Sequence, residues 1–315
     1  MDQTSARTRF PWLTKPTPAL KSREFGTIFL FMAPALLVFT VFLIYPIVQS
    51  AYYSFFNWKG FGPAVDFVGA DNYFRILTDR NFLRALQNGL LIVMLSLTVQ
   101  LPMALGLALL VGRNLPGRVF FRTVFFLPYV FSEVITALVW QALYHPDPHY
   151  GLINAILTNW GLSAVPFLGD RRTVMLAIFA ALTWKYFGFH MLLYMAGLQN
   201  IPAELEEAAK IDGASGPQIL RHIIIPLLRG TIRTTVFLSV LGSLQVFAIV
   251  WLMSQGGPAG ASETMATYLY RFGFVRFYLG YGSAVAVVMF LICITFSLIY
   301  QKLFKEQDYL GGYNA

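Results

Sequence analysis

The sequence predicts an all-α integral membrane protein with six transmembrane helices, and three observations support this fold class. Hydrophobic residues make up 57% of the 315 residues, charged residues only 12%, and the mean hydropathy is +0.61. A soluble globular domain carries about 25% charged residues, so too little polar surface remains for a water-soluble particle. Long uncharged stretches recur along the chain. The single cysteine, Cys293, lies in an apolar run, which excludes a disulfide-rich scaffold.

Six segments are long and apolar enough to span a membrane, which requires about 20 apolar residues for about 30 Å of hydrocarbon. Four of them are uncharged apart from Arg233 and Lys302 near their ends. The other two are interrupted by Glu133, with Arg122 near the start of that segment, and by Lys185 with His190. We expect one domain over 25–305, with a tail of residues 1–24 before it and a tail of residues 306–315 after it. The spans are expected at 25–53, 86–112, 119–144, 173–198, 230–254 and 280–304.

The distribution of basic residues predicts the side of the membrane that each loop faces. Of the 23 Lys and Arg residues, fourteen fall in segments that are cytoplasmic if the N-terminus is inside, and eight fall in the opposite segments. The positive-inside rule therefore favours a multi-pass protein of the inner or plasma membrane with cytoplasmic N- and C-termini. We attribute the net charge of +8 to this topology and expect no nucleic-acid partner. The first apolar segment is too long for a signal peptide, so we expect it to remain uncleaved.

The loop between the fourth and fifth predicted spans, residues 199–229, is rich in charged residues. Gly213 supplies the left-handed residue that commonly ends a helix. Ser215, followed three residues later by Gln218, is typical of a capping box that starts a second helix, which Pro226 would close. We predict two short helices across the inner face of the membrane. They suit contact with a soluble subunit, although a solvated interfacial helix has the same pattern.

The residue spacing within this loop is specific. Glu207-Ala208-Ala209 is followed by Gly213, Ile223 and Ile225-Pro226. This arrangement resembles the EAA loop of permease subunits in binding-protein-dependent ABC importers. Similarity to the carbohydrate-uptake branch, which includes maltose and glycerol-phosphate permeases, extends over roughly 25–305 and is clearest at 196–214, 68–73, 256–258 and 281–284. One departure is Ile225, which stands where the pattern usually has Leu.

The resemblance implies that residues 199–229 form a coupling helix pair seated in a groove of a cytoplasmic ATPase. It implies contact with membrane lipid and with three kinds of protein partner: a second homologous permease subunit, two ATPase subunits and an extracytoplasmic solute-binding protein. These 315 residues contain no Gly-x-x-x-x-Gly-Lys-Ser/Thr loop, so we expect no cofactor on this chain, with ATP and Mg²⁺ used by the ATPase partners. We expect no enzyme activity, catalytic residue or metal site. The implied coupling residues are Glu207, Ala208, Ala209, Asp212, Gly213, Ile223 and Pro226.

Polar and aromatic residues of the fourth and fifth spans mark the candidate substrate site, because polar groups at membrane depth usually face a bundle interior or a cavity. They recur at helical spacing, and they align with the substrate-contacting stretches of the maltose-type permease that the chain resembles. Aromatic faces together with hydroxyl and amide groups suit a sugar, although ordinary helix packing also places small residues at such positions. The candidate residues are Lys185, Tyr186, Phe189, Ser239, Gly242, Ser243, Gln245 and Val246.

The sequence therefore predicts half of the translocation pathway of an ATP-driven importer that carries a sugar, in particular an oligosaccharide, by alternating access. Two alternatives remain open. Lys185 is compatible with a polyol or a glycerophosphate-type anion as the cargo. A proton-coupled secondary transporter would use Glu133, Lys185 and His190. The sequence leaves open the identity of the sugar and the roles of Glu133 and His190.

Overall fold

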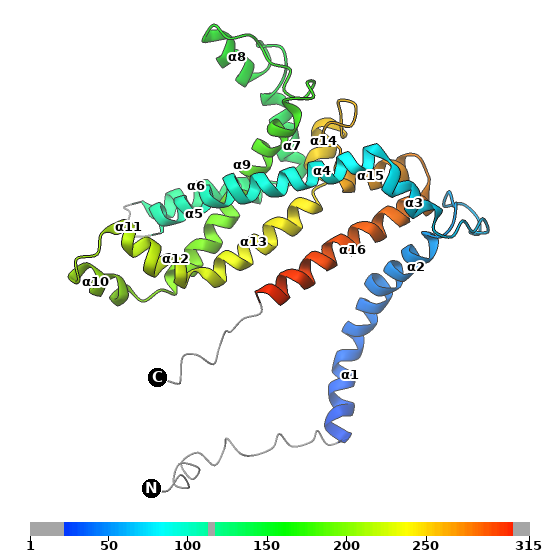
Figure 1. Ribbon diagram of the computed structural model, residues 1–315, viewed down its shortest axis with the longest axis horizontal. Coiled ribbons are helices and arrows are strands. Elements are labelled where there is room, and N and C mark those ends of the chain that lie inside the picture. The colour runs from blue at the N-terminus through cyan, green and yellow to red at the C-terminus, as the bar shows by residue number, and fades with distance from the viewer. Residues whose placement is uncertain (1–21, 113–116, 305–315) are drawn as a thin grey trace. The chain divides into compact units, whose positions relative to one another are not determined.

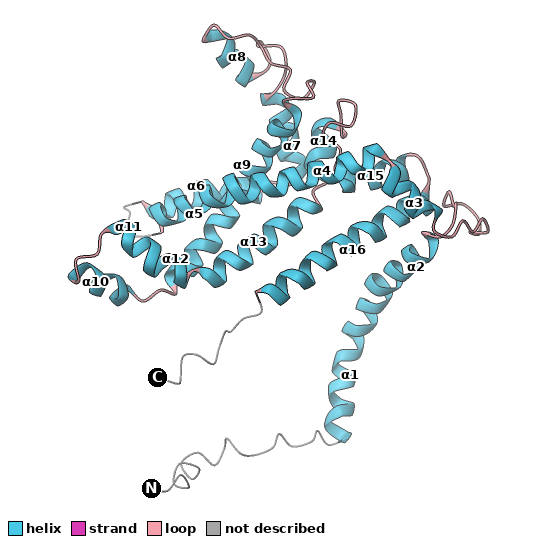
Figure 2. Cartoon of the chain, in the orientation of Figure 1, coloured by secondary structure: helices cyan, strands magenta, loops and turns pink. Residues whose placement is uncertain are grey.

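The computed structural model describes residues 22–112 and 117–304, and every regular element within these two ranges is a helix (Figures 1 and 2). An isolated bridge pairs Phe56 with Phe67. Residues 1–21 of the predicted N-terminal tail, residues 113–116 and the predicted C-terminal tail lie outside the described residues. The chain divides into two compact units, Met1–Tyr52 and Tyr53–Ala315. The predicted all-α class is confirmed for the described part of the chain.

The first unit contains a long apolar helix. Helix α1, Ser22–Phe39, continues through a π-helical turn, Thr40–Ile44, into α2, Tyr45–Tyr53. No side chain is buried in the most apolar window of Ile28–Tyr53. An apolar helix without a buried face requires an apolar solvent, so this segment suits a lipid bilayer.

The second unit contains the other helices. Its π-helical turns are Ser96–Gln100, Leu220–Ile224 and Arg271–Val275. Its α-helices are α3 Asp71–Thr78, α4 Arg80–Leu95, α5 Leu101–Val111, α6 Arg118–Val130, α7 Glu133–Leu143, α8 Leu152–Asn159, α9 Val174–Gln199, α10 Ala203–Ile211, α11 Gly216–Ile219, α12 Ile225–Leu227, α13 Arg229–Leu244, α14 Ala248–Ser254, α15 Met265–Tyr270 and α16 Leu279–Leu303.

Among the described residues, four helices are long and apolar enough to cross a membrane, and six segments qualify if each sharply bent helix pair counts as one span. The pairs are α6 with α7, bent by 97°, and Gly216–Leu227 with α13, bent by 68°. The fifth predicted span, 230–254, is also interrupted, because α13 ends at Leu244 and α14 begins at Ala248. The four long segments are Ile28–Tyr53, Arg80–Val111, Val174–Gln199 and Leu279–Leu303.

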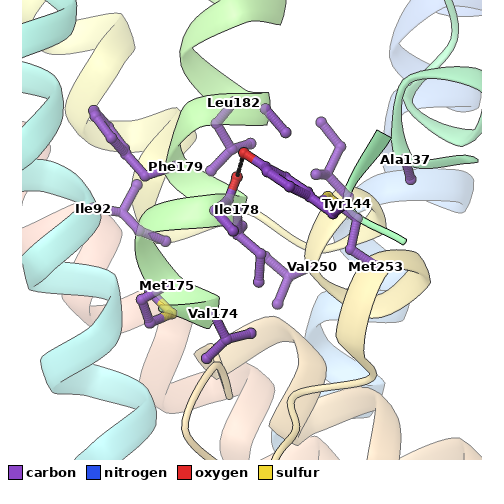
Figure 3. Close-up of a cluster of buried hydrophobic side chains, with 13 residues drawn as sticks. Ile92, Ala137, Tyr144, Val174, Met175, Ile178, Phe179, Leu182, Val250 and Met253 are labelled. Atoms are coloured by element: carbon purple, nitrogen blue, oxygen red, sulfur yellow. Dashed lines mark hydrogen bonds between the residues drawn. The ribbon is translucent and has the colours of Figure 1, made fainter. Parts of the chain in front are cut away.

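Helix α9 lies at the centre of the second unit and packs against α5, α6, α13 and α14. One buried cluster joins α9 to α4, α7 and α14 (Figure 3). In it the Tyr144 hydroxyl donates a hydrogen bond of 3.2 Å to the carbonyl oxygen of Ala177. A buried hydroxyl is costly unless it is paired, so this bond makes a tyrosine tolerable among aliphatic side chains. The helices α4, α7, α9 and α14, which surround the candidate site, thus share one buried cluster of side chains.

Candidate functional site

The third apolar segment, which the sequence presents as one run over 119–144, is divided by the bend between α6 and α7. Phe131 and Ser132 adopt extended backbone conformations there. The Ser132 hydroxyl caps α7 by accepting a hydrogen bond from the amide of Ile135 at 3.2 Å. This cap competes with a continuous helix. It places Glu133 in the first turn of α7, where the helix dipole favours a carboxylate.

Lys185 of α9 satisfies the open end of α6. Its side chain is 4% exposed, and its ammonium donates hydrogen bonds to the carbonyl oxygens of Phe131 at 2.5 Å and Tyr129 at 3.4 Å. The charge also lies 5.8 Å from the centre of the Tyr129 ring and 5.5 Å from that of Tyr186. The last carbonyls of a helix lack partners within the helix and attract cations. The backbone of α6 thus supplies the partner that a buried ammonium needs.

Glu133 is held on the other side of the same bend. The Tyr186 hydroxyl donates a hydrogen bond of 2.5 Å to Oε1 of Glu133. The Tyr186 ring meets Tyr129 edge to face, with 6.1 Å between ring centres. Tyr129 in turn stacks on Phe189, with ring centres 4.8 Å apart and planes 16° from parallel. The bend therefore brings one carboxylate and three aromatic rings together.

A buried chain of polar groups connects the neighbouring helices. The hydroxyls of Ser96 and Ser239 lie 2.7 Å apart, which joins the π-helical turn after α4 to α13. Ser96 also donates to Oε1 of Gln100, whose Nε2 donates to the carbonyl oxygen of Leu182 on α9 at 3.4 Å. Polar groups in an apolar interior are costly unless they are paired. These hydrogen bonds therefore orient three helices around one space.

That space is a cavity of about 400 Å³ lined by residues of α4, α6, α7, α9 and α13 and of the segment that leads into α14. Seven of the eight predicted substrate residues line it: Tyr186, Phe189, Ser239, Gly242, Ser243, Gln245 and Val246. Lys185 is not among the lining residues, because its ammonium is directed to the end of α6. The further lining residues are Ile92, Gln100, Tyr129, Glu133, Phe179, Leu182, His190, Leu238, Phe247 and Ala248.

Two polar lining residues, Gln100 and Tyr129, were not selected from the sequence. Gln100 could have been found, because Ser96 and Gln100 stand four residues apart in a predominantly apolar span. Tyr129 carried no such signal, since tyrosine is common near membrane interfaces. Its role depends on a ring stack with a residue 60 positions further along the chain.

His190 lines the cavity but is only 5% exposed. No described residue forms a hydrogen bond with either ring nitrogen, and Nδ1 is fully buried. The ring instead packs edge to face on Phe189, with 5.4 Å between the ring centres. His190 is therefore a buried polar side chain whose ring nitrogens form no hydrogen bond with the described residues.

The loop over 199–229 forms two helical segments that meet at Gly213. Gly213 has φ of +83° and follows the end of α10. The capping box of Ser215 and Gln218 is present at the start of α11. Both local predictions are confirmed. The second segment continues past Pro226 to the end of α12 and then bends into α13.

The residues of this loop that the resemblance implicates in coupling lie mostly at its surface. Glu207, Ala208, Asp212 and Gly213 are exposed, and Ala209, Ile223 and Pro226 are partly buried. The apolar side chain of Ile211 is 86% exposed beside them. An open hollow of about 370 Å³ next to the bend is lined by Asp212, Gly213, Ala214, Gln218, Ile219, His222 and Ile223. An exposed apolar side chain beside a hollow suits contact with another protein.

The long apolar helices and the cavity between them define a multi-pass α-helical membrane protein of the transporter class. Residues 100–307 match the family of binding-protein-dependent transport system inner membrane components, and the chain belongs to this family. The predicted resemblance is thus confirmed. The protein is a permease subunit, a transport component rather than an enzyme, of a binding-protein-dependent ABC importer.

Relatives agree with this assignment, and a solved structure has a similar fold. The chain is 37% identical to the probable ABC transporter permease protein YurN of Bacillus subtilis over 281 residues, which cover 88% of this chain and 95% of YurN. It is 33% identical to the trehalose/maltose transport system permease protein MalF of Thermococcus litoralis over 287 residues, 91% of this chain and 96% of that protein. The fold resembles a chain of a bacterial ABC transporter involved in the import of the acidic polysaccharide alginate, with a TM-score of 0.80, 24% identity, and coverage of 91% and 98%.

Proposed function

We propose that this permease forms half of the translocation pathway for a sugar, in particular an oligosaccharide. The observation that carries the proposal is the cavity, which combines stacked aromatic rings with hydroxyl, amide and carboxylate groups. A sugar offers C–H faces that pack on rings and hydroxyls that need hydrogen-bond partners. The trehalose/maltose name of one relative supports the same cargo class.

Six crossings of the membrane are part of the proposal. The four long apolar helices, the bent pair α6–α7, and α13 with α14 supply the six segments. The domain then covers 25–305, and the tails 1–24 and 306–315 both lie in the cytoplasm. The excess of Lys and Arg in the segments assigned to the inside supports this orientation.

The loop over 199–229 is proposed as the coupling helix pair. Two ATPase subunits would bind such pairs on this chain and on a second, homologous permease, while a solute-binding protein delivers the sugar from outside. ATP binding would close the ATPases and turn the cavity outward, and hydrolysis would return it inward by rigid-body motion. This chain would bind no cofactor itself. The exposed Ile211 and the hollow at Gly213 support a protein contact at this position.

A pull-down from native membranes in mild detergent tests the coupling loop. We expect an ATPase and a second permease to co-purify with the parent chain, and the ATPase to be lost from Gly213→Asp. The matched control is Gly62→Asp, because Gly62 also has a positive φ, +67°, with open space around it, but lies in a different loop. Retention of the ATPase by Gly213→Asp, or its equal loss from both variants, would overturn the coupling assignment.

Uptake by the native cell tests the cargo. Labelled maltotriose, sorbitol and glycerol 3-phosphate represent an oligosaccharide, a polyol and a glycerophosphate-type anion. We expect loss of the permease to abolish uptake of the oligosaccharide class. Loss confined to sorbitol or glycerol 3-phosphate would favour the corresponding alternative cargo. Proton coupling is disfavoured because the chain belongs to an importer family that depends on binding proteins.

A further inference from the structure

The charge that faces the cavity differs from the charge that the sequence suggests. Lys185 is the basic residue of the candidate substrate set, and its positive charge made an anionic cargo one of the alternatives. Among the described residues that line the cavity, however, Glu133 is the only Asp, Glu, Lys or Arg. The cavity wall of this chain therefore carries an acidic group where the sequence suggested a basic one.

The ammonium of Lys185 bonds to the end of α6 and does not line the cavity. Two carbonyl oxygens of the α6 end accept its hydrogen bonds, at 2.5 Å and 3.4 Å, and two tyrosine rings cover its charge. With 4% of its side chain exposed, the ammonium has little access to a solute in the cavity. Its ammonium and the Glu133 carboxylate attract each other across the bend.

Glu133 is oriented for a ligand. Oε1 accepts the hydrogen bond from Tyr186 at 2.5 Å, and no described residue donates a hydrogen bond to Oε2. The tyrosine is itself positioned by its contact with the Tyr129 ring. An ionised carboxylate accepts hydrogen bonds only, so the open oxygen suits the hydroxyls of a neutral solute. In a largely apolar cavity the same charge repels an anion much more strongly than it would in water.

We propose that Glu133 is the specificity-determining residue of the cavity, which accepts hydroxyl groups of a neutral, polyhydroxylated substrate and disfavours anionic substrates. The inference rests on the proposed function in one respect: the cavity must be the substrate pathway. It assigns Glu133 a role in cargo selection, and it argues against the glycerophosphate-type alternative.

The charge of the cavity can be measured without knowing the cargo. Ser243 lines the cavity and becomes the reporter as Ser243→Cys, in a background in which Cys293→Ala removes the single native thiol. The probes are methanethiosulfonates of similar reactivity, one with a trimethylammonium group and one with a sulfonate group. Their rate constants are measured on the assembled importer in native membranes, and the ratio is divided by that for a free thiol. A potential of about one kT changes this ratio about sevenfold.

We expect the cationic reagent to be favoured about sevenfold, and Glu133→Gln to remove most of this preference while it keeps the shape of the side chain. Glu204→Gln, on the exposed face of α10, is the matched control and should leave the ratio unchanged. An unchanged ratio in Glu133→Gln, or a preference for the anionic reagent in the parent, would overturn the inference alone. The neutral methyl reagent separates the two proposals: if it also fails to label Ser243→Cys, the cavity admits no solute and the substrate pathway itself is refuted.

Discussion

Gly188 of α9 and Phe125 of α6 meet so closely that a side chain on the glycine has no space. A Cβ atom placed on Gly188 would lie 1.9 Å from the carbonyl oxygen of Phe125 and 2.7 Å from its carbonyl carbon. Small residues allow this backbone approach between membrane helices. The contact lies in the turn of α9 that presents Tyr186 and Phe189 to the cavity. It therefore sets the distance between these rings and Tyr129 of α6.

Gly188→Ala is therefore expected to destabilise the protein by about 1–3 kcal/mol, because α9 must move away from α6. Thermal unfolding of the importer in detergent, followed by loss of the monodisperse chromatographic peak, measures the change. Gly106→Ala is the control, since Gly106 of α5 has no atom within 4 Å of the position of a new Cβ. Equal unfolding temperatures for the two variants would contradict the close contact.

Replacing Lys185 by Met removes the donor from the carbonyls of Phe131 and Tyr129. Hydrogen bonds that involve a charged group contribute about 1.5–3 kcal/mol, and we expect a loss of stability in this range. The measurement is thermal unfolding with Lys210→Met, on the exposed face of α10, as the control. If Lys185→Met kept the parent's stability but lost uptake, direct contact of Lys185 with the substrate would be favoured instead.

The hydroxyl pair of Ser96 and Ser239 predicts coupling between helices. In a double-mutant cycle of Ser96→Ala and Ser239→Ala, we expect a coupling free energy of about 0.5–1.5 kcal/mol, because either single variant leaves a buried hydroxyl with fewer partners. Unfolding of the four proteins measures it. In the control cycle Thr98→Ala replaces Ser96→Ala, and it should be additive because Thr98 bonds only to the backbone of its own helix. If the free-energy changes were additive in both cycles, the hydrogen bond between Ser96 and Ser239 would be refuted.

Glu263, between α14 and α15, predicts a dependence of stability on pH. Burial raises the pKa of this carboxyl, although Arg271, at 3.1 Å from it, acts in the opposite direction. Because the pKa is higher in the folded than in the unfolded state, the contribution to stability is fully present below the unfolded pKa. It is lost as the pH rises through the folded pKa.

Unfolding temperatures measured from about pH 4 upwards, the region where an unfolded glutamate titrates, test this expectation. We expect the difference in unfolding temperature between the parent and Glu263→Gln to shift against the parent as the pH rises. The isosteric amide does not titrate in this range. A parent that gains stability relative to Glu263→Gln over the same range would show that the Arg271 pair dominates and that the folded pKa is lowered.

Local signals in the sequence predicted local structure well. The helix end at Gly213 and the capping box of Ser215 and Gln218 depend on backbone geometry and on hydrogen bonds within a few residues, so the sequence alone is sufficient to recognise them. Helical spacing similarly selected Ser239 and Ser243, which face the same cavity. Their role in substrate binding remains a prediction.

The sequence alone determined that the chain is a membrane protein of apolar helices and that its charged loop resembles that of an importer permease, because composition and short-range pattern carry both properties. Only the tertiary structure decided which of Lys185 and Glu133 faces the cavity. Lys185 and Glu133 are 52 positions apart, and their orientations follow from the bend that exposes the carbonyls of α6 to one and the Tyr186 hydroxyl to the other. Helical periodicity identifies the side of a helix on which a residue lies. The partner that it meets there depends on how the helices pack.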